Sequence, residues 1–302
     1  MIATPENHPL KAAMVMIAAM LFIGVIDNFI APMAEHIGLW QFHFIRTLIA
    51  LPMVALMSLF GMGTLWPVRM WAVALRSALL AVSMLFYFSA LAFMPIQQAL
   101  AGLFTSPIFI LLVTVGFMGQ RIGPWRILAV AVGFTGILFV LQPNPADFDV
   151  TILIPVAGGF FYALSAIATR SLCAHESTLS MLAGVLVMLG LAGACGVAVL
   201  AIFRVEAVPG ADGFAARGWV WPVDKAIGWI VMQAVGSIAG VYLIIRAYQL
   251  AEPSYIGVFE YSVMIFGPLF AWIAFGNPVG GWQAFGIALI VFAGIIIALR
   301  SK

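Results

Sequence analysis

Ten apolar runs, each long enough to cross a lipid bilayer as a helix, occupy most of this sequence. A transmembrane helix needs about 20 mostly apolar residues. The runs fall near residues 12–33, 39–60, 70–93, 97–118, 125–142, 151–171, 178–203, 226–249, 254–275 and 282–299. Each is too long for a membrane strand and none alternates with a period of two, which excludes a β-barrel. We therefore expect an all-α integral membrane protein with ten transmembrane helices.

Composition supports this class and excludes several others. Of the 302 residues, 65% are hydrophobic and 8% are charged, whereas soluble domains average about 45–50% and about 25%. So much apolar surface has to face lipid, which is therefore an expected partner. A net charge of +2 indicates no polyanion-binding surface, so no nucleic acid is expected. The two cysteines lie in apolar segments without a CxxC spacing, and we predict neither a metal site nor a cofactor.

Basic residues are distributed unevenly between the loops. With both termini in the cytoplasm, those that fall on or near the cytoplasmic side are Lys11, Arg69, Arg76, Arg121, Arg126, Arg170, Arg246, Arg300 and Lys302. The outer side receives Arg204, Arg217 and Lys225, all within the long loop 204–225. By the positive-inside rule, this asymmetry predicts cytoplasmic N and C termini.

The two halves of the chain resemble each other. The matches run in order: Ala92 with Ala247, Gly102 with Gly257, Phe104 with Phe259 and, after a shift of two residues, Gly119 with Gly276 and Trp125 with Trp282. Five helices is an odd number, so the second half must lie inverted in the membrane. We expect two five-helix repeats, residues 1–143 and 144–302, around a central cavity. Such inverted repeats are the architecture of secondary transporters.

Short motifs recur at equivalent positions of the two halves. They are Phe104-Thr105-Ser106-Pro107 with Gly119-Gln120-Arg121, and Phe259-Glu260-Tyr261-Ser262 with Phe275-Gly276-Asn277-Pro278. These motifs, together with Gly133 to Pro143, resemble the drug/metabolite transporter superfamily in its ten-helix, EamA-type branch. The chain departs from that pattern at Gln120 and Asn277, where the family usually has glutamate. The resemblance implies a basket of helices that carries small organic metabolites across the inner membrane.

Ionisable residues inside the spans are few, and at membrane depth they are costly enough to indicate function. Asp27 lies about fifteen residues from the inner end of the first run, and Arg46 lies about seven residues from the outer end of the second run. At ~1.5 Å per residue these distances are roughly 22 Å and 10 Å, so in a hydrocarbon core about 30 Å thick the two residues lie at nearly the same depth. His43 shares a helix face with Arg46, and Asn28 adjoins Asp27. We predict that these four residues form a polar substrate-binding cluster at the outer end of the cavity. The alternative is a structural ion pair between the first two helices.

A second cluster is expected toward the cytoplasm. Arg246 and Glu260 lie about seven residues on either side of the turn at Pro253, hence at similar depth. They are predicted either to bind substrate or to form a hairpin salt bridge. Arg76, near the start of the third run, is expected to extend toward the interface and only secondarily to be a cavity charge.

The remaining candidate substrate-binding residues carry no charge. Their aromatic rings could stack on a flat solute and their hydroxyl groups could bind its polar atoms, although aromatic residues in membrane helices more often serve packing. They are Tyr87, Phe104, Thr105, Ser106, Tyr162, Phe259 and Tyr261. The aromatic residues in the spans favour an amphipathic solute such as an amino acid, a vitamin, a nucleoside, a drug or a molecule like S-adenosylmethionine.

We predict a secondary transporter that works by alternating access, and not an enzyme. Proton coupling, exchange and facilitated diffusion stay open as its driving mechanism. The sequence has no HExxH, GxSxG or Walker motif, so no catalytic residue is assigned. Asp27 and Glu260 are the predicted coupling residues, with Glu260 the better candidate.

Two other classes stay open. One is an intramembrane enzyme that modifies a lipid or metabolite with Asp27, His43 and Glu260 as acid and base groups. The other is a channel, although no ring of filter residues is visible. A monomer is expected and a dimer stays possible, because Gly236 and Gly240 form a GxxxG pattern that can serve either.

Overall fold

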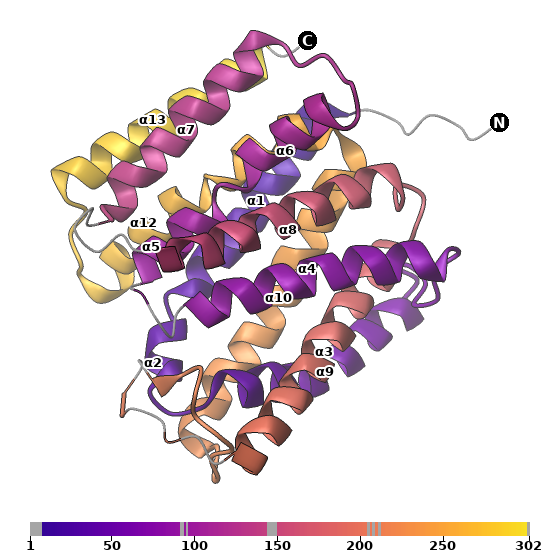
Figure 1. Cartoon of the computed structure of the whole chain (residues 1–302), viewed down its shortest axis with the longest axis vertical. Helices are drawn as coiled ribbons and strands as arrows, with labels where there is room; N and C mark the ends of the chain where they lie inside the picture. The colour runs from indigo at the N-terminus through magenta and orange to yellow at the C-terminus, as the bar shows by residue number, and fades with distance from the viewer. Residues whose placement is uncertain are drawn as a thin grey trace.

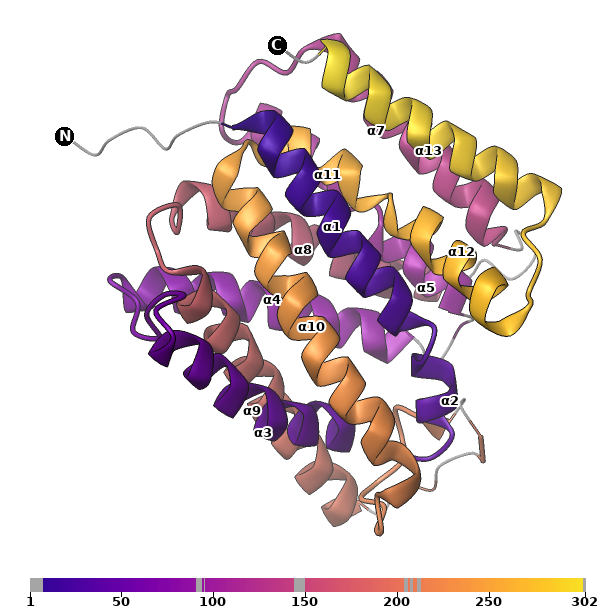
Figure 2. The same cartoon turned by 180° about the vertical axis from the view of Figure 1, so that it is seen from behind.

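Helices account for the regular structure of the chain wherever the computed structural model describes it (Figures 1 and 2). The structure describes residues 8–300 except 91–93, 95, 144–149, 204–205, 207–208 and 211–212, and at 96 and 97 it describes the backbone alone. Within this part of the chain, ten helical spans are long and apolar enough to cross a membrane. The all-α, ten-span fold class predicted from the sequence is therefore confirmed.

The described part of the chain up to the end of the fifth span contains seven helical segments. They are α1 (Pro9–Asp27), α2 (Ile30–Ala34), α3 (Leu39–Leu59), α4 (Met70–Ala90), α5 (Ile96–Leu103), α6 (Ser106–Gly116) and α7 (Pro124–Leu141). Of these, α2 lies between the first two spans. The sixth span begins with a short 3₁₀ turn, Val150–Ile152. The helices of the last five spans are α8 (Leu153–Ser171), α9 (Thr178–Phe203), α10 (Asp224–Leu250), α11 (Pro253–Glu260), α12 (Val263–Phe275) and α13 (Gly281–Arg300).

The first span is shorter than its apolar run predicts. Helix α1 ends at Asp27, and the short helix α2 continues in another direction (Figure 2). The side chain of Asn28 causes part of this ending, because its Nδ2 donates to the carbonyl of Gly24 at 2.7 Å. An amide that satisfies a last-turn carbonyl favours helix termination. Asp27 therefore lies at the end of a helix and not in its middle.

The fourth and ninth spans are each broken near their middle. The fourth changes from α5 to α6 around Thr105, whose Oγ1 donates to the carbonyl of Gly102 at 2.6 Å. The ninth changes from α11 to α12 around Ser262, whose Oγ donates to the carbonyl of Phe259 at 2.7 Å. In both breaks a hydroxyl group thus satisfies a carbonyl three residues earlier, as interrupted membrane helices require. Pro107 adds to the first break, because it cannot donate a backbone hydrogen bond.

The helix pairs follow a simple exchange rule. The most extensive contacts join α7 with α13, α3 with α9, α1 with α10, and α4 with α8. Exchanging each span of the first half with the span at the same place in the second half replaces α1 by α8, α3 by α9, α4 by α10 and α7 by α13. Under this exchange the pairs α7–α13 and α3–α9 are unchanged, and the pair α1–α10 becomes the pair α8–α4. Figure 1 shows α7 with α13 along one edge of the molecule and α3 with α9 along the opposite edge.

Close packing between these helices depends on glycine. A Cβ at Gly136 of α7 would lie 2.7 Å from the carbonyl oxygen of Gly286 in α13. A Cβ at Gly240 of α10 would lie 2.6 Å from Ile23 of α1, and Gly236 contacts Ile26 of the same helix. The GxxxG pattern of α10 is therefore used inside the chain, against α1.

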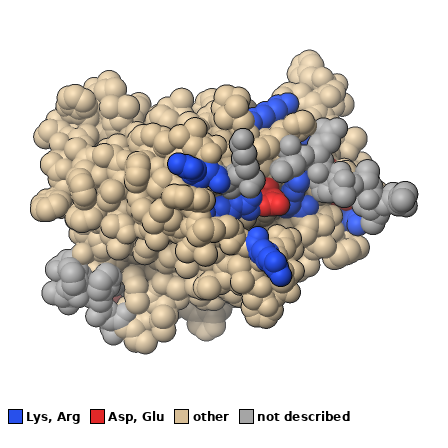
Figure 3. All heavy atoms as spheres, turned by 90° about the horizontal axis from the view of Figure 1, so that it is seen from above, with Lys and Arg blue, Asp and Glu red and all other residues tan. Residues whose placement is uncertain are grey.

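Both described ends of the chain lie at one end of the molecule, where the basic residues also gather (Figures 1 and 3). At this end Arg126 pairs with Glu252, and Arg170 donates to the carbonyl of Gln249. Glu176 accepts from the backbone N–H groups of Val68 and Arg69 at 2.8 and 2.7 Å. These contacts hold the ends of α4, α7, α8 and α10 together.

Candidate functional site

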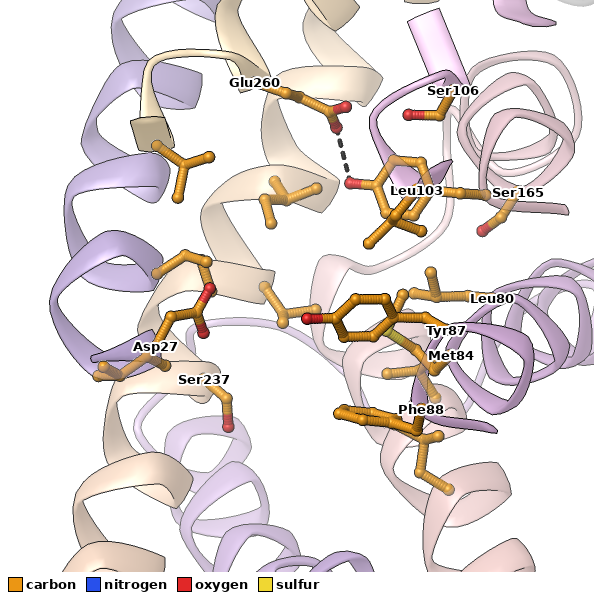
Figure 4. Close-up of a pocket in the computed structure, with 18 of the residues that line it drawn as sticks. Asp27, Leu80, Met84, Tyr87, Phe88, Leu103, Ser106, Ser165, Ser237 and Glu260 are labelled. Atoms are coloured by element: carbon orange, nitrogen blue, oxygen red, sulfur yellow. Dashed lines mark hydrogen bonds between the residues drawn. The ribbon is translucent and has the colours of Figure 1, made fainter. Parts of the chain in front are cut away.

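A cavity of about 220 Å³ lies between the central helices. Helices α1, α3, α4, α5, α8, α9 and α10 supply its walls, and Glu260 and Val263 reach it from the two sides of the break in the ninth span. Apolar side chains cover most of the wall. The predicted residues that line it are Asp27, His43, Arg46, Tyr87, Phe104, Ser106, Tyr162 and Glu260. Members of both predicted clusters, Asp27 and Glu260 among them, thus share one cavity (Figure 4).

Glu260 is held by two tyrosines. The carboxylate, which is 2% exposed, accepts hydrogen bonds at Oε1 from the hydroxyl groups of Tyr162 at 2.6 Å and Tyr248 at 2.8 Å. Tyr162 belongs to α8, Tyr248 to α10, and Glu260 ends α11. The carboxylate therefore joins three helices at the point where the ninth span is broken.

Arg246 lies apart from this cluster. Its side chain is exposed, it is not on the cavity wall, and the described structure contains no ion pair between it and Glu260. The predicted hairpin pair is wrong because depth alone was considered. Val241, Ile244 and Tyr248 face the cavity, and Arg246 is two residues from each of the last two. At 100° per residue it faces the other side of α10.

The outer cluster forms only in part. Nη2 of Arg46 donates to Nδ1 of His43 at 3.2 Å, and the Arg46 guanidinium carbon lies 5.0 Å from the centroid of the Phe42 ring. Asp27 lines the same cavity, yet no ion pair with Arg46 occurs within the described residues. The alternative of a structural ion pair between the first two transmembrane helices is therefore wrong. Figure 4 shows Asp27 and Tyr87 pointing toward one another across the cavity.

For Arg76 the first expectation is wrong and the secondary one, a charge at the cavity, agrees with the structure. The side chain does not extend to the interface; it is 2% exposed and lines the cavity. Its Nε donates to Oγ1 of Thr169 at 3.0 Å. The spacing in α4 could have revealed this position, because Arg76, Leu80, Met84 and Tyr87 are separated by four, four and three residues and line one helix face.

Three predicted residues at the helix breaks face away from the cavity. Thr105 directs its hydroxyl to the carbonyl of Gly102. Phe259 packs against Tyr255 with ring centroids 5.4 Å apart, inside the apolar core. Tyr261 is fully buried, and its ring lies where a Cβ on Gly133 would approach it to 2.5 Å. These three side chains therefore pack the fold and are not part of the cavity wall.

A second cavity of about 400 Å³ adjoins the first. Asn28 lines this one only, together with Asn277 and Gln283. Asp27 and Tyr87 line both cavities, so they stand at the boundary between them.

Asp27, His43 and Glu260, the predicted acid and base groups, all line the first cavity. Glu260 is bonded to tyrosines and His43 to Arg46, and Asp27 bonds neither of them among the described residues. General acid–base chemistry needs such groups within hydrogen-bond reach of one substrate. The same part of the chain contains no cluster of three or more His, Cys, Asp or Glu residues that could hold a metal ion.

Similarity to known proteins defines the family. A sequence model of the EamA-like transporter family matches residues 10–142. A riboflavin transporter of Rhizobium johnstonii is 30% identical over 85% of this chain and 78% of its own length. A riboflavin transporter of Vibrio cholerae is 25% identical over 95% and 93% of the two chains. An S-adenosylmethionine uptake transporter of Rickettsia bellii is 23% identical over 86% and 82%.

The fold also matches a solved structure. A protein crystal structure superposes with a TM-score of 0.78 at 19% identity, covering 96% of this chain and 97% of that chain. The chain belongs to the EamA-like transporter family of the drug/metabolite transporter superfamily. It is a multi-pass membrane protein that transports small metabolites.

Proposed function

We propose that this protein carries a flat heteroaromatic vitamin of the riboflavin class across the inner membrane. The observation that carries this proposal is the 30% identity, over 85% of the chain, with a protein named as a riboflavin transporter. The cavity supports it, because a largely apolar wall with Tyr87, Phe88 and Phe104 suits a planar ring. The amides of Asn28, Asn277 and Gln283 in the adjoining cavity suit a polyhydroxyl chain.

The charges of the cavity favour a neutral cargo over a cationic one. Arg46 and Arg76 line it together with Asp27 and Glu260, so the formal charges of these four groups cancel. Riboflavin has no net charge at neutral pH, whereas S-adenosylmethionine has a net positive charge. The second candidate cargo, S-adenosylmethionine, rests on the 23% identity with the Rickettsia bellii transporter.

Transport proceeds by alternating access between two inverted repeats, residues 1–143 and 144–302. The exchange rule for the helix pairs is what a two-fold relation between the halves produces. The equivalent breaks at Thr105 and Ser262 support the same division. In such carriers the substrate site lies where the halves meet, beside interrupted helices.

The basic end of the molecule faces the cytoplasm. Arg126 and Arg170 lie at the end of the molecule that holds both described ends of the chain, and the positive-inside rule assigns such an end to the inner side. The loop around Arg217 then lies outside, where this side chain donates to the carbonyls of Ala34 and Ile37.

Glu260 carries the coupling proton, and Asp27 contributes a second titratable group. The two tyrosine hydroxyl groups stabilise the Glu260 carboxylate when the proton has left. The change from the sequence-based picture is the partner, since tyrosines take the place expected for Arg246.

Counterflow in proteoliposomes tests the proposed cargo. Vesicles loaded with unlabelled riboflavin should accumulate labelled riboflavin transiently, and unlabelled S-adenosylmethionine should not compete. Empty vesicles and vesicles loaded with uridine are the controls. Saturable exchange of S-adenosylmethionine without riboflavin exchange would show that S-adenosylmethionine, and not riboflavin, is the cargo. Absence of exchange with either cargo would refute both.

A further inference from the structure

Arg76 places a guanidinium group with unused donors against the central cavity. The residue is 2% exposed and belongs to the cavity wall. The one hydrogen bond that its guanidinium group makes to the described residues runs from Nε to Thr169. Neither Nη1 nor Nη2 has a hydrogen-bond partner among these residues, and Nη1 is completely buried. No described carboxylate forms an ion pair with this cation.

The surrounding contacts fix the group in this position. Oγ1 of Thr169 donates to the carbonyl of Ser165 at 2.8 Å while it accepts from Arg76. Oγ of Ser165 in turn donates to the carbonyl of Arg76 at 3.2 Å. Helices α4 and α8 are thus joined around the base of the arginine, and the far end of the guanidinium group is left free. A buried cation without a counter-charge is costly, and a bound ligand is one way to meet its donors.

The cavity combines this donor with surfaces for a flat ring. Leu80, Met84 and Tyr87 continue the same face of α4 beyond Arg76. In Figure 4, Ser165 and Glu260 lie toward one end of the cavity, and Tyr87 and Phe88 lie toward the other. A planar ligand on these side chains can direct one polar edge toward the arginine.

We propose that Arg76 determines specificity by donating hydrogen bonds to the carbonyl-bearing edge of the cargo ring. This inference rests on the proposed function, since a riboflavin-class ring carries two carbonyl oxygens along its pyrimidine edge. Planar guanidinium groups are suited to such acceptors because their N–H groups have a fixed direction. Arg46 contributes less at its own end, because one of its terminal nitrogens is already bonded to His43.

A purely structural role predicts a different pattern of effects. If Arg76 served to join α4 and α8, Thr169→Val would remove the same link and would weaken the protein as much as Arg76→Gln. If Arg76 binds cargo, Thr169→Val preserves most of the binding and Arg76→Gln does not.

Riboflavin binding to purified protein in detergent tests the inference, with quenching of flavin fluorescence as the signal. Arg76→Gln should weaken binding about tenfold or more, as expected for a hydrogen bond from a charged donor. Arg246→Gln is the matched control, because that arginine is exposed and off the cavity wall. It should bind riboflavin like the unaltered protein. Thermal unfolding and gel filtration of each variant report folding separately.

A second ligand makes the test independent of the variants. Flavins with sulfur in place of one ring carbonyl oxygen keep the shape but accept hydrogen bonds weakly. At least one of the two positional isomers should bind the unaltered protein several-fold more weakly than riboflavin. In Arg76→Gln this difference should disappear.

The outcomes separate the two proposals. Two results would refute the role of Arg76 while the proposed cargo stands, provided that the unaltered protein binds riboflavin. One is that Arg76→Gln binds riboflavin equally well. The other is that both thio-flavins bind the unaltered protein as tightly as riboflavin does. If the unaltered protein does not bind riboflavin, the proposed cargo fails and the carbonyl-edge inference fails with it.

Discussion

The hydroxyl group of Tyr261 donates a hydrogen bond to the carbonyl of Phe104 at 3.4 Å and so joins the two broken spans. Tyr261 follows the last residue of α11, and Phe104 follows the last residue of α5. A Cβ on Gly257 of α11 would lie 3.3 Å from Pro107 of α6, which shows how closely the two interrupted spans pass. The breaks therefore form one structural unit beside the cavity.

This unit depends on a glycine in the neighbouring helix α7. We predict that Gly133→Ala destabilises the protein by about 1–3 kcal/mol, because the new methyl group would overpack against the ring of Tyr261 at 2.5 Å. Thermal unfolding in detergent measures the effect. Gly116→Ala is the matched control, since nothing lies within 4 Å of its added Cβ. Equal unfolding temperatures for the two variants would contradict the close approach.

Glu260→Gln tests the proposed coupling. The amide cannot carry a proton through the pH range of transport, so uptake driven by a pH gradient should be lost, while riboflavin counterflow should persist at least in part. Proteoliposomes with and without an imposed pH gradient provide both measurements. Glu35→Gln, at an exposed glutamate, should keep the gradient dependence. Full retention of that dependence in Glu260→Gln would make the carboxylate a purely structural partner of Tyr162 and Tyr248.

Gln41 should hold the outer loop in place. Its amide donates to the carbonyl of Val220 and accepts from the N–H of the same residue, both at 2.8 Å. Gln41→Ala removes both bonds and should make the loop about 1–3 kcal/mol easier to detach. Trypsin added outside right-side-out vesicles should then cut faster at Arg217. Gln120→Ala, at an exposed glutamine in another loop, should leave the rate unchanged. Cutting only from the inner side would reverse the proposed orientation.

Cys173 should resist alkylation in the folded protein. It is completely buried in the turn between α8 and α9, and burial raises the pKa of its thiol to about 11. Because the thiolate is the reactive form, its fraction at neutral pH is below about one in a thousand. Mass spectrometry after maleimide treatment at pH 7 should find Cys173 unmodified, and modified once the protein is unfolded. Rapid labelling of the native protein at pH 7 would contradict this burial.

The sequence predicted the spans well because span length and hydropathy depend on the lipid solvent, not on tertiary contacts. Depth also brought Asp27 and Arg46 together, but it assigned Glu260 to a separate cluster, whereas the structure places all three on one cavity. Sequence reasoning failed for Arg246 and for the first expectation at Arg76, because depth was counted and helix face was not. The four-and-three spacing of Arg76, Leu80 and Tyr87 contained that information. The orientation of Thr105 and Tyr261 depends on the helix breaks themselves, whose local geometry hydropathy does not encode.

The helix breaks give the wall of the cavity a polarity that comes from the backbone and not from side chains. Helices α6 and α12 begin inside their spans, and α5 and α11 end there. Every helix has a partial positive charge at its first amides and a partial negative charge at its last carbonyls. The residues at these four ends, Leu103, Ser106, Glu260 and Val263, line the cavity, where lipid and apolar side chains screen the dipoles poorly. A variant stripped of all its ionisable cavity residues would still present an electrostatic field to a passing solute, generated by the peptide backbone alone.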